Sequence, residues 1–399
     1  MNITDIARNV FYCGVNDRVT DKFEGLWPLP QGVSYNSYIV KGKDKIALID
    51  TVRIDEVREF LDHVHAISGS ATIDYLIINH MEPDHSGSIP VVLAEFPDIR
   101  IVGNAQTVSM VKGFYGITDD SRYCLIKDGD TIDLGERELR FYLTPMVHWP
   151  ETMMCYVPDV RLLFSGDAFG CFGALCGGVT DSEMDSDRYI PEMYRYYSNI
   201  VGKYGKFVEK AIAKLADIEL DYICPTHGPV WHERISEVMD IYGNLAAYRP
   251  EKGVTIIYGS MYGNTAEVAE IISRRLAQRG MRNIRVHSAT HSSMSEMISD
   301  AFRYEGLVVG SATYSMRLMP PVEAFMSAME TREVKNKVFA AFGSYTWAKG
   351  AALGALREYA ERMKMPVVAS LTMQQSITDA FRAEAEALAD AVYDALTLK

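Results

Sequence analysis

The sequence lacks the cysteine patterns that would assign it to several classes of protein. Its six cysteines contain no CxxC pair, which argues against a zinc ribbon, a rubredoxin-type iron site, an iron–sulfur cluster and a dithiol redox motif. Any metal site is therefore expected to use nitrogen and oxygen ligands. The cysteines themselves are predicted to be reduced, partly buried thiols of a cytoplasmic protein.

Positive charge and long apolar segments are also scarce. The chain has 40 Lys and Arg against 53 Asp and Glu, a net charge of −13, so a nucleic acid or an anionic membrane would be repelled on average. The longest apolar runs, such as VFAAF, are far shorter than the ~18 residues of a membrane span, and the first residues do not resemble a signal peptide. We expect a soluble, cytoplasmic protein without nucleic-acid or membrane partners.

The length and composition favour two folded domains. The chain has 399 residues, of which 48% are hydrophobic and 23% charged, and single cores stop growing near ~250–300 residues. A linker is predicted at residues 248–253, where Pro and Gly flank charged residues, and all six cysteines precede it. The predicted domains are 1–249 and 250–399.

The second predicted domain alternates strands and helices. Five apolar strands are expected at 254–260, 284–289, 306–311, 337–344 and 366–372. Helices are expected between and after them, near 265–279, 294–302, 349–364 and 376–397, with one more following Pro320 and Pro321. This order predicts an α/β domain with a doubly wound parallel five-stranded sheet, whose ligands bind at the carboxyl ends of the strands.

The first predicted domain is rich in strands, with helices expected near 55–66, 87–96, 105–114 and 205–215. Apolar strands are expected in the segments YNSYIV, KIALID, DYLIIN, RIVG, RFYLTP, RLLFSG and DYICPT. Periodicity leaves the choice between α/β and α+β open.

Candidate metal ligands follow several of these strands. His80, Glu82 and Asp84 alternate in the segment HMEPDH, where Pro83 interrupts regular structure, so their side chains would share one side of an extended loop. Further candidates stand at other strand ends: His148, Asp167 and His227. A pair of divalent metals needs about six protein donors with one bridging carboxylate, and mixed imidazole and carboxylate ligands suit iron, manganese or zinc.

A second group of polar and aromatic residues follows three strands of the second predicted domain. A turn that leads into a helix is expected to bind a phosphate group through backbone N–H groups and hydroxyls; it consists of Ser260, Met261, Tyr262, Gly263, Asn264 and Thr265. It lacks the lysine of a nucleotide-hydrolysing loop, and it lacks the GxGxxG pattern of a dinucleotide site. The other two loops contribute Ser311, Ala312, Thr313, Tyr314 and Ser344, Tyr345, Trp347, Gly350. Hydroxyl groups and rings at one sheet edge suit a planar isoalloxazine with its ribityl chain.

These motifs resemble known families. The metal residues resemble the HxHxDH signature of the metallo-β-lactamase superfamily over most of residues 30–232, with the variant HxExDH that is typical of flavodiiron proteins. The resemblance implies an N-terminal αββα sandwich in which His80, Glu82 and His148 hold one iron, Asp84 and His227 hold the other, and Asp167 bridges them together with a water-derived ligand. His85 matches a position that usually stays outside the inner ligand set. The second half resembles flavodoxin, which implies FMN.

The combined resemblance implies a flavodiiron oxidoreductase. Such proteins use FMN to pass electrons from an external donor, such as rubredoxin, another flavoprotein or a reduced deazaflavin, to a diiron site that reduces dioxygen to water, nitric oxide to nitrous oxide, or both. The resemblance also implies a head-to-tail homodimer or a dimer of dimers. His85, Tyr197 and Trp149 are expected in the pocket near the irons, and Trp27 at a channel or partner surface.

Two alternatives remain open at this stage. One is a zinc-dependent hydrolase of the metallo-β-lactamase fold fused to a flavodoxin domain, against which Glu82 argues. The other is an electron carrier without catalytic activity, against which the complete set of six donors argues.

Overall fold

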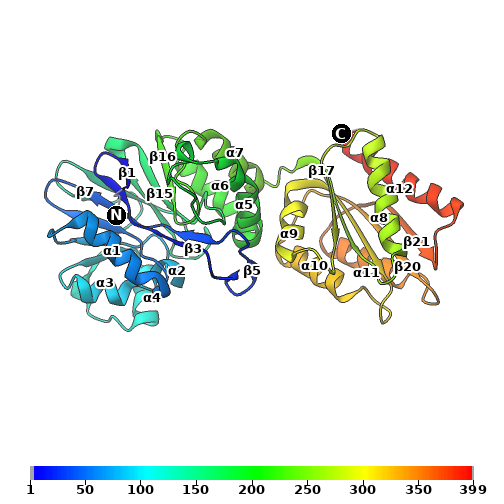
Figure 1. The fold of residues 1–399 in the computed structure, drawn as a ribbon, viewed down its shortest axis with the longest axis horizontal. Helices are drawn as coiled ribbons and strands as arrows, with labels where there is room; N and C mark the ends of the chain where they lie inside the picture. The colour runs from blue at the N-terminus through cyan, green and yellow to red at the C-terminus, as the bar shows by residue number, and fades with distance from the viewer. Residues whose placement is uncertain (1–3, 398–399) are drawn as a thin grey trace. The chain divides into compact units, whose positions relative to one another are not determined.

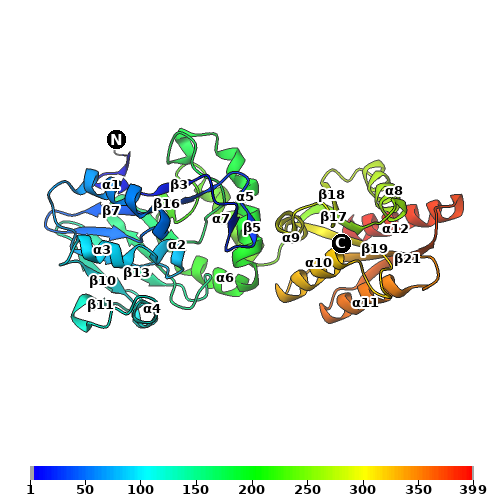
Figure 2. The same ribbon diagram turned by 60° about the horizontal axis from the view of Figure 1, so that its bottom comes forward.

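The structure, a computed structural model, describes residues 4–397. The chain divides into two compact units, Met1–Ala246 and Ala247–Lys399, here called the N-terminal and C-terminal units (Figures 1 and 2). The division lies three residues before the predicted boundary at residue 249. No helix within residues 4–397 is long and apolar enough to cross a membrane.

The N-terminal unit is built on two large sheets. The first has the strand order β1 (Thr4–Ala7), β2 (Val10–Tyr12), β7 (Tyr38–Lys41), β8 (Ile46–Ile49), β9 (Tyr75–Ile77), β10 (Arg100–Gly103), β11 (Tyr123–Leu125). The second has the order β12 (Thr131–Asp133), β13 (Glu138–Leu143), β14 (Met153–Val157), β15 (Leu162–Gly166), β16 (Tyr222–Pro225). Two small pairs complete it: β3 (Val15–Asp17) with β6 (Val33–Tyr35), and β4 (Lys22–Phe23) with β5 (Trp27–Pro28).

The two large sheets share one apolar core, in which Val40 and Ile49 of the first sheet belong to the same buried cluster as Phe141 and Phe164 of the second. The helices are α1 (Val57–Ser68), α2 (Pro83–Ser86), α3 (Ile89–Glu95), α4 (Ala105–Tyr115), α5 (Tyr189–Tyr196), α6 (Gly205–Lys214) and α7 (Ile235–Ala246). Helices α1, α3 and α4 gather beside the first sheet, and α5, α6 and α7 beside the second (Figures 1 and 2). This arrangement confirms the predicted αββα sandwich.

One strand expected from the sequence is two strands. The segment YNSYIV is interrupted at Asn36, so that Tyr35 ends β6 and Tyr38 begins β7. The Asn36 side chain donates hydrogen bonds to the carbonyl oxygens of Pro225 (2.9 Å) and Gly228 (2.8 Å). The chain leaves the sheet here because a buried amide that bonds to two carbonyl groups of a distant loop competes with regular strand pairing.

The C-terminal unit has a parallel five-stranded sheet in the order β18 (Ile284–Ser288), β17 (Glu251–Gly259), β19 (Tyr304–Ala312), β20 (Val338–Tyr345), β21 (Val367–Gln374). Its helices are α8 (Asn264–Gln278), α9 (Met294–Arg303), α10 (Pro320–Thr331), α11 (Ala351–Arg362) and α12 (Asp379–Thr397). Helices α8 and α12 pack together on one face of the sheet, and α9, α10 and α11 lie on the other (Figure 1). The predicted doubly wound sheet is confirmed.

Candidate metal centre and flavin site

The ligand segment between β9 and α3 differs from the extended loop that the alternation of residues 80, 82 and 84 suggested. Pro83 begins the short helix α2 (Pro83–Ser86) instead of only interrupting structure, because its fixed φ suits the first turn of a helix. Glu82 stays extended at the helix N-cap with φ −57° and ψ 139°. The helical turn therefore directs Asp84 to a different set of partners from Glu82.

The first donor group contains His80, Glu82, His148 and Asp167, whose ligand atoms lie within 4.8 Å of one another. His148 Nε2 lies 3.1 Å from Glu82 Oε2 and 3.0 Å from Asp167 Oδ2. His80 Nε2 lies 3.3 Å from the same Glu82 oxygen and 3.4 Å from the same Asp167 oxygen. All four residues are buried.

The second donor group contains Asp84, His85 and His227 within the same 4.8 Å limit. Asp84 Oδ2 lies 3.2 Å from His85 Nε2 and 3.3 Å from His227 Nε2. Asp167 Oδ1 lies 3.2 Å from His85 Nε2 and 3.8 Å from His227 Nε2. Asp167 thus turns one carboxylate oxygen to each group, as a bridging ligand does.

His85 was expected outside the inner ligand set, but its Nε2 atom lies among the donor atoms of the second group. It is 3.1 Å from His227 Nε2, while its Nδ1 is buried without a hydrogen-bond partner among the described residues. The helical turn of α2 causes this placement, because it brings His85 to the same side as Asp84.

The electrostatics of the two groups fit a metal centre. Burial alone lowers the pKa of His148, but Asp167 and Glu82 outweigh it and raise the pKa to about 9. Burial alone raises the pKa of Asp167, but the charges of His80 and His85 hold it well below the ordinary range. Neither carboxylate oxygen of Asp84 has a hydrogen-bond partner among the described residues although both are buried. Several buried carboxylates and imidazoles that converge on two points, with the Asp84 oxygens left without a hydrogen-bond donor among the described residues, form an arrangement that cations would complete.

Aromatic side chains lie beside the donor residues. The Trp149 ring lies 5.3 Å from the His80 ring. Tyr197 packs against Tyr242 at 5.0 Å, and its neighbour Tyr196 is the residue that lies 5.5 Å from His227. Tyr197 begins a π-helical segment, Tyr197–Val201; sequence patterns do not reveal which of two adjacent tyrosines faces the cluster.

A cavity of about 710 Å³ includes one carboxylate residue of each donor group, Glu82 and Asp84, in its wall. Phe23, Glu24 and Tyr115 are also in its wall. Trp27 is not in the wall, but its Nε1 donates a 3.0 Å hydrogen bond to Glu24 Oε2. Trp27 therefore contacts a residue of the cavity wall, and its expected place at a channel or partner surface stays a prediction.

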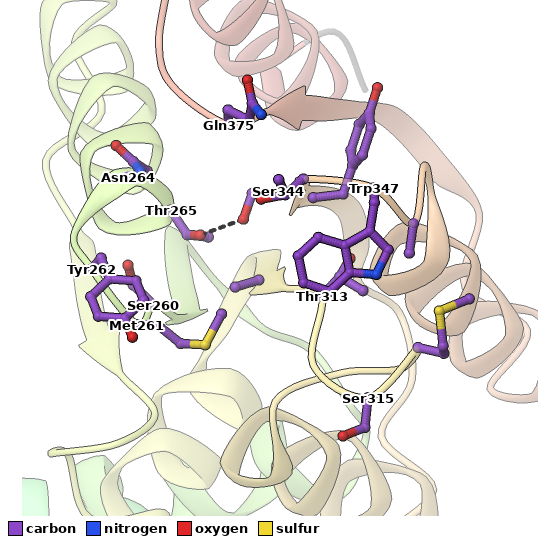
Figure 3. Close-up of a pocket in the computed structure, with 15 residues that line it drawn as sticks. Ser260, Met261, Tyr262, Asn264, Thr265, Thr313, Ser315, Ser344, Trp347 and Gln375 are labelled. Carbon is purple, nitrogen blue, oxygen red and sulfur yellow. Dashed lines mark hydrogen bonds between the residues drawn. The ribbon is translucent and has the colours of Figure 1, made fainter.

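A second cavity of about 430 Å³ lies at the carboxyl ends of the strands in the C-terminal unit (Figure 3). Of the predicted residues, it is lined by Ser260, Met261, Tyr262, Asn264, Thr265, Ala312, Thr313, Ser344, Tyr345 and Trp347. Figure 3 shows Tyr262 and Trp347 on opposite sides of the cavity. The hydroxyls of Thr265 and Ser344 lie 2.8 Å apart between two of the loops.

Four predicted residues do not line this cavity: Gly263, Ser311, Tyr314 and Gly350. The Ser311 hydroxyl accepts a 3.0 Å hydrogen bond from the Met319 amide, so it stabilises the loop before α10 instead. Gly263 is the N-cap of α8 with φ 96°, a conformation that glycine adopts without strain. The cavity also contains residues that the sequence did not single out, including Ser315, Met316 and Gln375.

This cavity fits a flavin mononucleotide. The helix α8 begins at its edge, where the first backbone N–H groups have no partner within the helix and favour an anion. Hydroxyl groups occupy the same end, and exposed rings stand at the sides.

Comparisons with known proteins agree with both sites. A family profile described as "ODP family beta lactamase" matches residues 33–228, and the Flavodoxin profile matches residues 256–388. The anaerobic nitric oxide reductase flavorubredoxin of Escherichia coli O1:K1 is 32% identical over 352 residues, which cover 87% of this chain and 73% of the relative. The chain belongs to the flavodiiron protein family.

Solved structures of flavodiiron proteins have the same fold over the whole chain. Rubredoxin oxygen:oxidoreductase from Desulfovibrio gigas is 26% identical, with a TM-score of 0.93 over 100% of this chain and 99% of the other. A flavodiiron protein variant from Thermotoga maritima is 27% identical, with a TM-score of 0.90 over 99% and 98% of the two chains. The flavodiiron assignment, rather than the zinc hydrolase alternative, is therefore the supported one. The flavodoxin-like unit implies FMN, and the family carries a diiron site.

Proposed function

We propose that this flavodiiron protein takes electrons from an external donor through FMN and delivers them to two irons that reduce dioxygen to water, nitric oxide to nitrous oxide, or both. The observation that carries the proposal is the pair of buried donor groups that share the two oxygens of Asp167. When bound, two irons supply redox chemistry and open coordination positions for a small molecule.

The residues proposed to hold the irons follow from the two groups. His80, Glu82 and His148 would hold the first iron. Asp84 and His227 would hold the second, with Asp167 between them and His85 Nε2 within reach. A carboxylate at Glu82 makes the first position a harder site than an imidazole would, which favours iron over zinc.

The chain itself supplies a path and a boundary for the substrate. The cavity of about 710 Å³ is lined by Glu82 and Asp84, so a diatomic molecule would reach the donor groups through it. Phe23 and Tyr35 belong to the same cavity wall, and their rings pack against His227 at 5.3 and 5.7 Å. The part of the wall beside the second donor group is therefore aromatic.

The FMN is proposed to occupy the cavity of the C-terminal unit. Its phosphate would lie at the start of α8 beside Ser260 and Thr265, and its ring system between Tyr262 and Trp347. None of the residues that line this cavity carries a formal charge. The phosphate would therefore be bound by neutral donors and the helix terminus.

We further propose a head-to-tail homodimer, or a dimer of such dimers, in which the FMN of one subunit serves the irons of its partner. Exposed apolar side chains border both sites: Leu26 and Phe114 near the metal cavity, and Met316 and Trp347 at the flavin cavity. Such exposed patches are typical of interfaces. Mixing subunits that carry Asp167→Ala with subunits that lack FMN is expected to restore partial turnover; heterodimers no more active than the parents would refute the arrangement.

The electron donor is proposed to be a separate protein or cofactor, such as rubredoxin, another flavoprotein or a reduced deazaflavin. The sequence contains no CxxC pair that would bind a rubredoxin-type iron. The six cysteines are free thiols, five of them at least partly buried. They support the proposal that the protein works in the reducing cytoplasm.

The deciding experiment measures metals and flavin in protein purified anaerobically, followed by assays of dioxygen and nitric oxide consumption. About two irons and one FMN per chain are expected, with turnover abolished by His80→Ala or Asp167→Ala while FMN stays bound. Reproducible zinc without iron, even after iron-rich growth, would overturn the proposal. Unchanged turnover in either variant would overturn the ligand assignment.

A further inference from the structure

Glu151 is a fully buried carboxylate directly behind the first donor group. It lies three residues after His148, and none of its surface is exposed. Its Oε1 atom accepts hydrogen bonds from His80 Nδ1 and from the Met81 amide, both at 2.8 Å. Its Oε2 atom is buried with no hydrogen-bond partner among the described residues. A single oxygen, Oε1, therefore accepts both hydrogen bonds from residues 80 and 81.

The backbone of Glu151 is itself fixed to a rigid element. Asn104 Nδ2 donates a 2.6 Å hydrogen bond to the Glu151 carbonyl oxygen. The Asn104 side chain also accepts from the Gln106 and Thr107 amides at 2.9 and 3.2 Å, and so caps the N-terminus of α4. The orientation of the His80 ring is thus tied through Glu151 to the start of α4.

The imidazoles of the second donor group have different hydrogen-bond partners at their Nδ1 atoms. His227 Nδ1 lies 2.7 Å from the Ser34 carbonyl oxygen, which is a neutral acceptor. His85 Nδ1 has no hydrogen-bond partner among the described residues. Apart from the shared Asp167, each group has one carboxylate of its own, Glu82 or Asp84. The additional negative charge of Glu151 therefore distinguishes the first group from the second.

We infer that Glu151 is a positioning residue that directs His80 Nε2 toward the first metal position and makes that position more electron-rich than the second. A carboxylate that accepts the Nδ1 proton fixes the tautomer of a ligating histidine and increases the donor strength of its other nitrogen. The neutral carbonyl group of Ser34, which contacts His227 Nδ1, increases the donor strength of the His227 ring less than a carboxylate would. The inference rests on the proposed metal-binding role of the two donor groups.

The test compares Glu151→Gln and Glu151→Ala with the wild-type protein reconstituted with ⁵⁷Fe. The Gln variant keeps an oxygen that can accept from His80 and Met81 but removes the charge. A matched control is Glu95→Gln, because Glu95 Oε1 contacts His65 Nε2 at 2.9 Å in a half-exposed pair that belongs to neither donor group. Iron affinity is measured by chelator competition, the two iron environments by Mössbauer spectroscopy, and folding by thermal unfolding of the metal-free protein.

In Glu151→Gln, the Mössbauer parameters of one iron are expected to shift while those of the other stay as in the wild type, with unchanged unfolding of the metal-free protein. In Glu151→Ala, the affinity for one of the two irons is expected to fall about 10- to 100-fold. Glu95→Gln is expected to change neither. Spectra of Glu151→Gln identical to the wild type, or equal shifts of both irons, would overturn the inference even if Glu151→Ala fails to fold.

The outcomes for the wild type separate this inference from the proposed function. Two irons in the wild type with an unaffected Glu151→Gln variant would refute the role of Glu151 alone. Two zinc ions would refute the iron chemistry, while the competition assay would still report whether Glu151 supports one metal position. A wild type that binds no metal after reconstitution would refute both.

Discussion

Removal of the metal is expected to make the stability of the N-terminal unit depend on pH through His148. The His148 side chain is only 6% exposed, and Asp167 and Glu82, acting against its burial, raise its pKa to about 9 in the metal-free fold. An unfolded histidine has a pKa of ~6.5. Because the folded pKa is the higher one, the contribution of the protonated ring is fully present below pH 6.5 and is lost as the pH rises toward 9.

The size of this contribution follows from the shift. A difference of about 2.5 pKa units at ~1.4 kcal/mol per unit corresponds to roughly 3 kcal/mol of folding free energy. This is a large part of the ~5–15 kcal/mol stability of an ordinary domain. A bound metal needs the neutral imidazole, so the metal-loaded protein is expected to lack this dependence on His148 protonation over the same interval.

The assay is urea unfolding of the chelated, full-length protein between pH 6.5 and 9, compared at each pH with His148→Gln. Fluorescence is suitable because Trp149 lies beside His148. The stability difference between wild type and variant is expected to shrink by roughly 3 kcal/mol across the interval. A difference that stays constant or grows with pH would refute the reasoning.

Three further predictions concern single residues elsewhere. Trp347→Ala is expected to weaken FMN binding about 10-fold, by loss of ring stacking, in a fluorescence titration, and an unchanged dissociation constant would contradict the placement of the flavin ring. Gly263→Val forces a branched residue to φ 96° at the start of α8, which is expected to cost roughly 1–3 kcal/mol in unfolding and to weaken FMN binding as well. Burial lowers the pKa of Lys337 to about 7, so the free energy of unfolding of the C-terminal unit should rise from pH 7 to pH 10. Lys337→Met should remove that rise. An equal dependence of the unfolding free energy on pH in the two proteins would contradict the prediction.

The candidate metal donors that the structure brings together could be singled out in the sequence because they follow apolar strands. A His or Asp directly after a run of mostly apolar residues, as at Asp167 after LLFSG, can be recognised from the sequence alone. The bridging position of Asp167 was expected only from the resemblance to flavodiiron proteins, because no local pattern distinguishes a bridging carboxylate from any other. The fold class followed in the same way from the alternation of strands and helices in the C-terminal unit.

Residues that act on these donors could not be predicted, because their partners are far away in the chain. Glu151 contacts His80 across 71 positions, and no local pattern marks that pairing. The inclusion of His85 depended on the helical turn at Pro83, which a sequence reading treats as an interruption. Gln375 lines the flavin cavity from the loop after β21, whereas the hydroxyl residues of that loop, Ser376 and Thr378, are not in the cavity wall.

The link between residues 34–36 and 225–228 determines when the metal centre becomes complete during protein synthesis. Ser34 contacts His227 and the Gly228 amide across more than 190 positions, and Asn36 bonds to Pro225 across 189. A nascent chain that has emerged only as far as Asp167 already contains five of the six predicted donors. It lacks His227 and the carbonyl groups of Pro225 and Gly228 to which the Asn36 side chain donates. We therefore expect the complete set of donors to assemble only after β16 has been synthesised and has joined the second sheet.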